Sequence, residues 1–189
     1  MSETETSSSQ ASSLAFSAFS TTLFIFGLAM TGVLGDSSLT TVAPMGLFFG
    51  GLILLLSGMV SFKVNDMFSG TISLSYAGFW MAVGLMLGMQ HWLSASGGDM
   101  GVFFLAWSVF TLYAWIASWK KGAAVSLHYL LWLIALILLF IGAFTGGQLL
   151  TAIGGWFSFA SALVGWYVAA AKLFYDSYGR RILKLGKGM

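Results

Sequence analysis

Six long apolar runs, almost free of charged residues, constrain the fold of this chain more than any other feature. A bilayer core offers no water, so only helices or closed barrels satisfy their backbone hydrogen bonds there. A helix needs about 20 apolar residues to cross that core, and each run is continuous over about that length. The sequence therefore predicts six transmembrane helices, at 14–34, 42–62, 70–92, 101–119, 124–144 and 149–174.

The overall composition supports a membrane protein and excludes several kinds of site. Hydrophobic residues make up 58% of the chain and charged residues 7%, whereas a soluble domain carries about 25% charged residues. The chain has no cysteine, so disulfides and thiolate metal sites are excluded. Its net charge of +2 is too small to indicate nucleic-acid binding. The expected fold class is an all-α, polytopic membrane protein with six transmembrane helices.

The two ends of the chain differ from its apolar middle, and the charges predict an orientation. Residues 1–13 are polar and rich in serine, which predicts a disordered N-terminus before the six-helix domain at 14–174. A basic tail at 175–189 follows, which either contacts anionic lipid headgroups or is solvated. All eight Lys and Arg residues lie at or beyond the ends of the second, fourth and sixth runs. The positive-inside rule makes that side cytoplasmic, with both termini there, in the cell membrane.

The third run, Gly70–Trp92, carries two different faces. At 100° per residue, small residues gather on one arc, while hydroxyl and aromatic residues gather on the other. One interpretation is a helix that lines a pathway. The other is a packed helix of a bundle, whose Ser and Thr side chains bond their own backbone carbonyls. The pattern leaves both open.

The sequence gives little support for catalysis or for a bound metal. His91 and His128 stand at opposite ends of their helices, roughly 30 Å apart, so one metal or haem cannot use both. Both are expected to lie at the membrane interface. Ser57 and His128 faintly suggest an intramembrane serine protease, but no further residue completes a nucleophile and base. No carboxylate lies inside a run, which argues against a carboxylate proton relay. We therefore expect no enzyme, no catalytic residue and no cofactor.

Several short motifs, in order and with similar spacing, resemble the acetate uptake transporter family, which includes the succinate–acetate permeases. They are Gly46-Leu-Phe-Phe-Gly50-Gly51, Phe68, Ser75-Tyr76-Ala77-Gly78-Phe79-Trp80, Trp107-Ser-Val-Phe110-Thr111-Leu112, Lys121-Gly122-Ala123, Gly155-Trp156, Tyr178-Gly179-Arg180 and Ile182-Leu183-Lys184-Leu185-Gly186. The resemblance implies six helices and a hexamer in which each protomer carries its own pathway. It also implies transport of acetate or a similar small monocarboxylate.

The same resemblance implies site residues. A narrow apolar constriction in the family falls on Phe19, Tyr76 and Leu133. Hydrogen bonds to the substrate are expected from Thr21, Thr22 and Ser75, and the entrance is expected near Gln10 and Leu14. Passive flow and proton coupling both remain open, as do succinate, lactate and ammonium as substrates. The rival from another class is a membrane scaffold or assembly factor that transports nothing.

Overall fold

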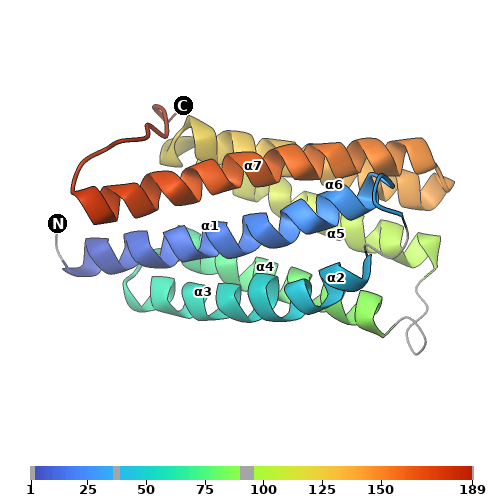
Figure 1. Ribbon diagram of the computed structural model, residues 1–189, viewed down its shortest axis with the longest axis horizontal. Coiled ribbons are helices and arrows are strands. Elements are labelled where there is room, and N and C mark those ends of the chain that lie inside the picture. The colour runs from blue at the N-terminus through green and yellow to red at the C-terminus, as the bar shows by residue number, and fades with distance from the viewer. Residues whose placement is uncertain (1–2, 36–38, 90–95, 189) are drawn as a thin grey trace.

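A computed structural model describes residues 3–35, 39–89 and 96–188 as a bundle of long helices (Figure 1). The elements are α1 (Glu3–Met30), α2 (Leu39–Pro44), a π-helix η2 (Met45–Ile53), α3 (Leu54–Lys63), α4 (Met67–Gly88), α5 (Gly97–Ser118), a 3₁₀ turn η3 (Trp119–Lys121), α6 (Ala123–Thr145) and α7 (Gln148–Tyr178). No strand occurs among the described residues. The all-α fold class predicted from the sequence is confirmed.

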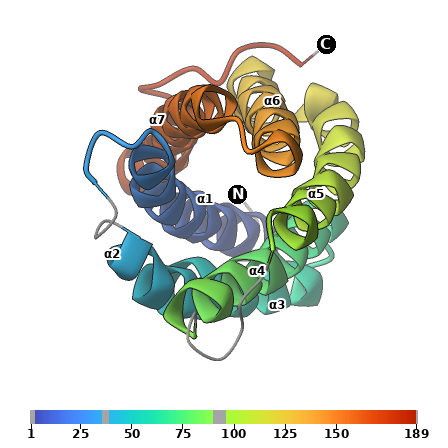
Figure 2. The ribbon, with the colours of Figure 1, turned by 90° about the vertical axis from the view of Figure 1, so that its right-hand side faces the viewer.

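Six helical stretches in the described chain are long and apolar enough to cross a membrane, as predicted. The second crossing is Leu39–Lys63, made of α2, η2 and α3 in succession, and the fourth is Gly97–Lys121. The third ends at Gly88, so Trp92 and His91 lie outside the described residues. Seen along its length, the bundle is a ring of helices in which α1 lies between α7 and the second crossing (Figure 2).

The second crossing departs from regular α-helix where glycines bring it against α4. Pro44 ends α2 and has no N–H to donate, and η2 follows directly. A Cβ added at Gly46 would lie 2.8 Å from the Trp80 carbonyl and 3.2 Å from Gly84 Cα. Small residues allow such approach of two backbones in membrane helices. The second and third crossings therefore pack tightly against each other through Gly46 and Gly84.

The N-terminal residues differ from the prediction, because α1 begins at Glu3 rather than after residue 13. The prediction of disorder is wrong for this stretch, which tertiary contacts hold. Ser8 Oγ donates to the Asp66 carboxylate at 2.8 Å, and Ser13 Oγ donates to the Ala169 carbonyl at 3.1 Å. A polar composition suits this helix because its serines bond neighbouring helices instead of water.

The basic tail begins later than expected and lies against the bundle. The helix α7 continues to Tyr178, and Gly179, with φ of +64°, ends it. The Leu185 carbonyl then accepts a hydrogen bond from Ala124 N–H at 2.9 Å, which satisfies one of the free N–H groups at the start of α6. The tail thus covers the end of the bundle that also carries Lys63 and Lys121. This end is called the basic end below.

Candidate functional site

The candidate site is a small cavity inside the ring, near the basic end. Its volume is about 30 Å³, which is enough to hold a water molecule. Four helices supply its walls at helical spacing. The lining residues are Ser12, Ala15, Phe16 and Phe19 from α1, Leu54 from α3, Phe68, Ser69, Ile72, Ser73 and Tyr76 from α4, and His128 and Tyr129 from α6. No Lys, Arg, Asp or Glu is among these described lining residues.

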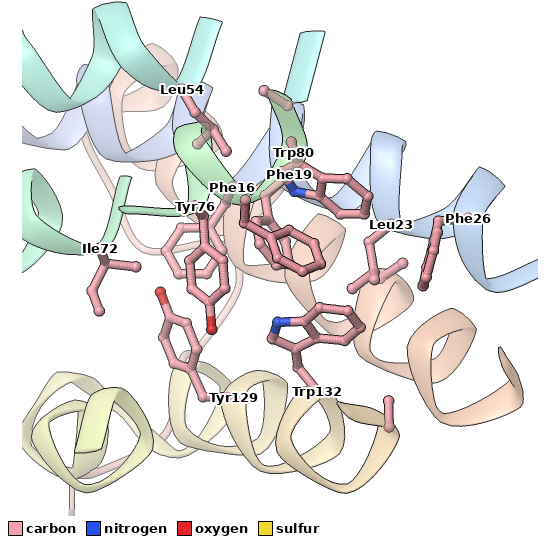
Figure 3. Packing of buried hydrophobic residues seen from close by; sticks show 14 of the residues in the cluster. Phe16, Phe19, Leu23, Phe26, Leu54, Ile72, Tyr76, Trp80, Tyr129 and Trp132 are labelled. Carbon is pink, nitrogen blue, oxygen red and sulfur yellow. The ribbon is translucent and has the colours of Figure 1, made fainter. Parts of the chain in front are cut away.

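Aromatic rings close the inner end of the cavity (Figure 3). The Phe19 ring meets the Tyr76 ring edge-on, with centroids 4.8 Å apart, and lies 5.7 Å from Trp80 and 6.1 Å from Trp132. Such edge-to-face pairs are favourable beyond the area that they bury. Phe19 and Tyr76 are both buried. In this structure the lumen is therefore closed at Phe19 and Tyr76.

The Tyr76 ring is fixed by its hydroxyl as well as by its neighbours. That hydroxyl lies 2.8 Å from Thr111 Oγ1 on α5. Thr111 Oγ1 donates its own hydrogen to the Trp107 carbonyl at 2.6 Å, so Tyr76 is the donor in the pair. Trp107 also stacks on Tyr76, at a centroid distance of 5.7 Å and an interplanar angle of 23°. Tyr76 therefore joins α4 to α5 at the point where it closes the lumen.

Two buried indole groups beyond this closure lack a hydrogen-bond partner. Trp80 on α4 and Trp132 on α6 are fully buried, and their rings are stacked at 6.4 Å and 17°. Neither Nε1–H makes a hydrogen bond of good geometry in the described chain, although the Tyr76 hydroxyl is a neighbour of the Trp132 indole. Both nitrogens lie on the edge of the ring that faces Tyr76 (Figure 3). A buried donor without an acceptor costs about 1–3 kcal/mol, which makes these two groups candidate ligands for a solute inside the lumen.

His128 lies in the cavity wall rather than at the membrane interface, where the sequence placed it. Its side chain is 1% exposed. Nδ1 lies 2.9 Å from the Ser161 carbonyl of α7, and the rings of Phe16, Phe19 and Tyr129 surround it within 5.4 Å. The prediction of an interfacial histidine is wrong, because the C-terminal tail covers the start of α6 at Ala123 and so places His128 inside the bundle.

The structure brings Phe19 and Tyr76 together but treats Leu133 differently. Leu133 is buried, yet it is not part of the contiguous core cluster that contains the other two. Trp132, the preceding residue, belongs to that cluster and faces Phe19. Leu133 therefore remains a prediction, and Trp132 is the residue of α6 that contacts the closure directly.

The hydroxyl groups expected to bind substrate face other directions. Thr21 accepts a hydrogen bond from Trp166 Nε1 at 3.0 Å, and Thr22 donates to the Ala18 carbonyl at 2.9 Å. Neither lines the cavity, and nor does Ser75. Thr21, two positions after Phe19, and Ser75, one position before Tyr76, point to other faces of their helices. Thr22, three positions after Phe19, packs against Gly50 of η2 instead, where an added Cβ would lie 2.8 Å from its Oγ1.

The predicted entrance residues also lie away from the cavity. Gln10 and Leu14 are exposed and line a separate surface hollow with Leu173 and Asp176, between the ends of α1 and α7. Leu14 is five positions before Phe19, which turns it about 140° away from the lumen. Ser12 and Ala15 occupy the lumen face instead.

Neither a protease pair nor a metal group forms among the described residues. Ser57 Oγ donates to the Ala11 carbonyl at 2.8 Å, while His128 bonds Ser161, so the suggested pair of Ser57 and His128 is not made. No cluster of three or more His, Cys, Asp or Glu occurs in the described part of the chain. His91 lies outside that part.

Sequence reasoning missed the cavity residues Ser12, Ser69 and Ser73 although their spacing carried a signal. Positions three, four and seven before Phe19 are Phe16, Ala15 and Ser12, and the same offsets from Tyr76 give Ser73, Ile72 and Ser69. Residues at these offsets share one helical face. Once Phe19 and Tyr76 were chosen, this rule would have found the other cavity residues of α1 and all of those of α4 except Phe68.

Comparison with known proteins now identifies the group to which this structure belongs. The profile of the GPR1/FUN34/yaaH family matches residues 2–180. The chain belongs to this family. The resemblance to acetate transporters read from the sequence is thereby confirmed at the level of the family.

Individual members of the family show how far the likeness extends. The chain is 25% identical over 149 residues to the succinate-acetate/proton symporter SatP of Escherichia coli, covering 77% of this chain and 79% of that protein. It is 30% identical over 176 residues to acetate permease A of Emericella nidulans, covering 84% of this chain and 59% of that protein. The chain spans 58–59% of the length of its fungal relatives.

A solved structure shares the fold. The structure of the bacterial acetate channel SatP matches with a TM-score of 0.86 over 94% of this chain and 98% of that one, at 24% identity. At this identity the match speaks for the fold. The relatives named here by sequence and by structure are thus transporters or channels.

Proposed function

We propose that this protein passes acetate, or a similar small monocarboxylate, across the cell membrane through a pathway along the axis of each protomer. The observation that carries the proposal is the closed lumen, a cavity that the rings of Phe19 and Tyr76 seal at its inner end. Membership of the GPR1/FUN34/yaaH family, whose members include a succinate-acetate symporter and an acetate permease, supports the choice of substrate.

The chemistry of the lumen fits a small carboxyl compound. Moving a carboxyl group out of water is costly unless hydrogen bonds replace those of the solvent. The unpartnered Nε1–H groups of Trp80 and Trp132 supply two donors just beyond the closure. Apolar rings at the closure exclude water and larger solutes, and so both gate the path and select by size.

Opening the path requires rotation of side chains rather than separation of helices. Turning the Tyr76 ring breaks its hydrogen bond to Thr111, whose net worth is about 0.5–1.5 kcal/mol. Rotamer changes of this kind are fast compared with helix movements. We infer a gate made of the rings of Phe19 and Tyr76, flanked by Trp132 and with Leu133 as a further member of the constriction.

One observation favours ammonium as a second candidate. The cavity wall carries the rings of Phe16, Phe68 and Tyr129, and no Lys or Arg is among its described residues. Ring faces attract cations, particularly where water is excluded. The names of two fungal relatives refer to ammonia transport. Ammonium and acetate are distinguished by the flux experiment below.

We also propose an orientation and an assembly. The basic end, with both termini, faces the cytoplasm, because Lys and Arg concentrate in cytoplasmic loops. Ser96, at the start of α5, then faces outside, and Ser96→Cys reacts with an impermeant thiol reagent on intact cells. Labelling of Ser96→Cys only in inverted vesicles contradicts the orientation.

A closed homo-oligomer, a hexamer by resemblance to the family, is the proposed assembly. The outer face of α5 carries exposed apolar residues, including Val102, Val109 and Tyr113, which suit lipid or a neighbouring protomer. Native mass measurement in several mild detergents tests this proposal. A monomer mass in all of them contradicts it.

The function itself is tested by the flux of labelled acetate into proteoliposomes, with and without an imposed pH gradient. Protein-free vesicles give the background, because undissociated acetic acid crosses lipid unaided. Competition by succinate, lactate and ammonium defines the substrate class, and the response to the gradient separates proton coupling from passive flow. Flux equal to that of protein-free vesicles for every solute overturns transport and favours the scaffold alternative.

A further inference from the structure

His128 is the basic side chain of the cavity wall, and its hydrogen bonds fix the position of its proton. The Ser161 carbonyl, 2.9 Å from Nδ1, can only accept, so Nδ1 carries the hydrogen in the neutral ring. Ser161 Oγ lies 3.1 Å from the same nitrogen and donates its hydrogen to the His128 carbonyl at 2.8 Å. The ring is thus held against α7 through one nitrogen, in one tautomer.

The other ring nitrogen, Nε2, is a free acceptor. No described residue donates a hydrogen bond to it, and it is not among the buried polar atoms that the fold seals without a partner. Because Nδ1 is bound to α7, the Nε2 side of the ring is the side left for the cavity that His128 lines. A lone pair on nitrogen therefore faces the lumen just before the closure.

The titratable neighbours of His128 are few. Tyr76 of α4 and Tyr129 of α6 line the same cavity, whereas α1 contributes Phe16 and Phe19 and α7 contributes Ser161, none of which titrates. Among charged groups, Lys121 lies over the ring of Phe68, a wall residue, at 5.0 Å and 3.9 Å from Asp66, and Lys172 of α7 interacts with both charges. No charged side chain of the described residues reaches the cavity wall.

These features decide which form of a carboxyl compound the site accepts. A carboxylate ion has only acceptor oxygens, which would meet the lone pair of Nε2 without a cation to compensate. An undissociated acid has one O–H donor and one carbonyl acceptor. Its O–H matches Nε2, and its carbonyl matches the free indole donors of Trp80 and Trp132 beyond the closure.

We propose that His128 Nε2 is a binding site for the acid proton of an undissociated small monocarboxylic acid, which makes the neutral acid the form that enters the closure. This inference rests on the proposed function, because it concerns the same pathway. Charge balance is simple: the proton stays on the acid, crosses with it and leaves with it. Net transport of one acid molecule then carries one proton without any carboxylate relay in the protein.

The first test observes His128 directly. The chain has two histidines, so His91→Gln leaves a single imidazole whose ¹⁵N resonances can be followed in nanodiscs. Without acetate, the spectrum is expected to show a protonated Nδ1 and a bare Nε2. Adding acetate at acidic pH, where the undissociated acid is abundant, is expected to shift Nε2 toward its hydrogen-bonded position. The same total acetate at alkaline pH, and equal chloride at acidic pH, should leave it unchanged.

The second test measures transport by His128→Gln, which keeps a side-chain N–H for the Ser161 carbonyl and removes the imidazole nitrogen. Acetate flux above background is expected to fall about tenfold, which corresponds to the loss of about 1.4 kcal/mol of binding. Ser158→Ala is the control, because Ser158 is buried on α7 but bonds its own helix at the Gly154 carbonyl. Its flux should match that of the original protein.

The two tests separate failure of this inference from failure of the proposed function. Clear flux by the original protein, with unchanged flux by folded His128→Gln and no acetate-dependent shift of Nε2, overturns the inference alone. An equal shift of Nε2 with ammonium at the same pH overturns the acid as the ligand. An acetate-dependent shift without any flux supports the site and overturns transport. If His128→Gln does not fold, the ¹⁵N spectrum still decides.

Discussion

Two helix–helix interfaces of the ring, here called seams, are packed in opposite ways: the seam between α1 and α7, and the seam between α4 and α5. Between α1 and α7 the backbones touch: a Cβ at Gly155 would lie 2.6 Å from Thr31 N and 2.8 Å from the Gly27 carbonyl. Between α4 and α5 the backbones approach closely at few points, and aromatic rings fill the gap. Phe79 stacks on Phe103 at 5.4 Å, and Tyr76 stacks on Trp107.

The difference teaches where this bundle can change its width. A seam of backbone against backbone has no side chain to rotate, so it acts as a fixed wall. A seam filled by rings has a width set by side-chain size and rotamer. Tyr76 belongs to the second seam and also lines the cavity against Phe19, so changes at α4 and α5 would reach the proposed pathway directly.

The largest expected effect comes from Phe19→Ala, which removes the ring that closes the lumen against the α4 seam. In soluble cores this change costs about 3–5 kcal/mol, so protein yield should fall. At matched protein amount, the lactate-to-acetate flux ratio should rise about tenfold, because small differences in pocket size discriminate solutes by that order. Phe24→Ala is the control, since Phe24 packs on Phe159 and Trp166 and does not line the cavity.

Leu133→Ala then decides the place of Leu133. A raised lactate-to-acetate flux ratio assigns Leu133 to the constriction, as the family resemblance implies. An unchanged ratio with reduced yield assigns it to ordinary packing. Should Phe19→Ala and Leu133→Ala both leave the ratio unchanged in folded protein, the closure is not the selective step.

Gly155→Ala should have the next largest effect, because the new methyl group meets backbone atoms that cannot move aside. Overpacking of this kind costs about 1–3 kcal/mol. Gly78→Ala is the matched control: it lies in the middle of α4 with nothing within 4 Å of its Cβ position. Thermal unfolding in the same detergent should show a loss for Gly155→Ala and none for Gly78→Ala. Equal midpoints would argue against a rigid seam between α1 and α7.

Tyr76→Phe should act more weakly, because it keeps the ring and deletes the hydroxyl that donates to Thr111. Thr111 keeps its own bond to the Trp107 carbonyl, so stability should fall by only about 0.5–1.5 kcal/mol. If the hydroxyl also binds substrate, the concentration of acetate at half-maximal flux should rise, while the lactate-to-acetate ratio stays as it was. A changed ratio would mean that the hydroxyl, not the ring, sets the size limit.

The smallest effect is expected at Asp66, where the α4–α5 seam ends. Burial raises the pKa of this carboxyl group, but hydrogen bonds from Ser69 and Ser8 and the charge of Lys121 outweigh it and hold the pKa below its ordinary value. A lowered pKa in the folded state stabilises at neutral pH, and that contribution is lost as pH falls through the folded pKa.

Asp66→Asn keeps an oxygen to accept from Ser69 N–H at the start of α4 and removes the charge. The expected loss at neutral pH is at most about 1 kcal/mol. The difference in unfolding midpoint between the two proteins should shrink at roughly pH 4 and below, where Asp titrates. A difference that persists unchanged into acid would show that charge is not its cause.

The sequence by itself determined the number and approximate places of the membrane crossings and the end at which the basic residues gather. Each depends on a sum along the chain: about 20 apolar residues in a row, or Lys and Arg counted per connection. The arc of small residues on the third run was also readable, and the structure packs it against Gly46 through Gly84. The family motifs pointed to Phe19 and Tyr76, whose rings lie 4.8 Å apart in the structure.

Only the tertiary structure decided which face of each helix looks inward. In a soluble bundle the outside is polar, and its period reveals the inner face. Here lipid makes the outside apolar too, so the sequence does not show which residues face inward. Ala15 and Phe19 line the cavity, whereas Leu14 and Thr22 do not. The burial of His128 against Ser161 and the helical order of residues 3–13 likewise depend on partners far away in the chain, which no local pattern encodes.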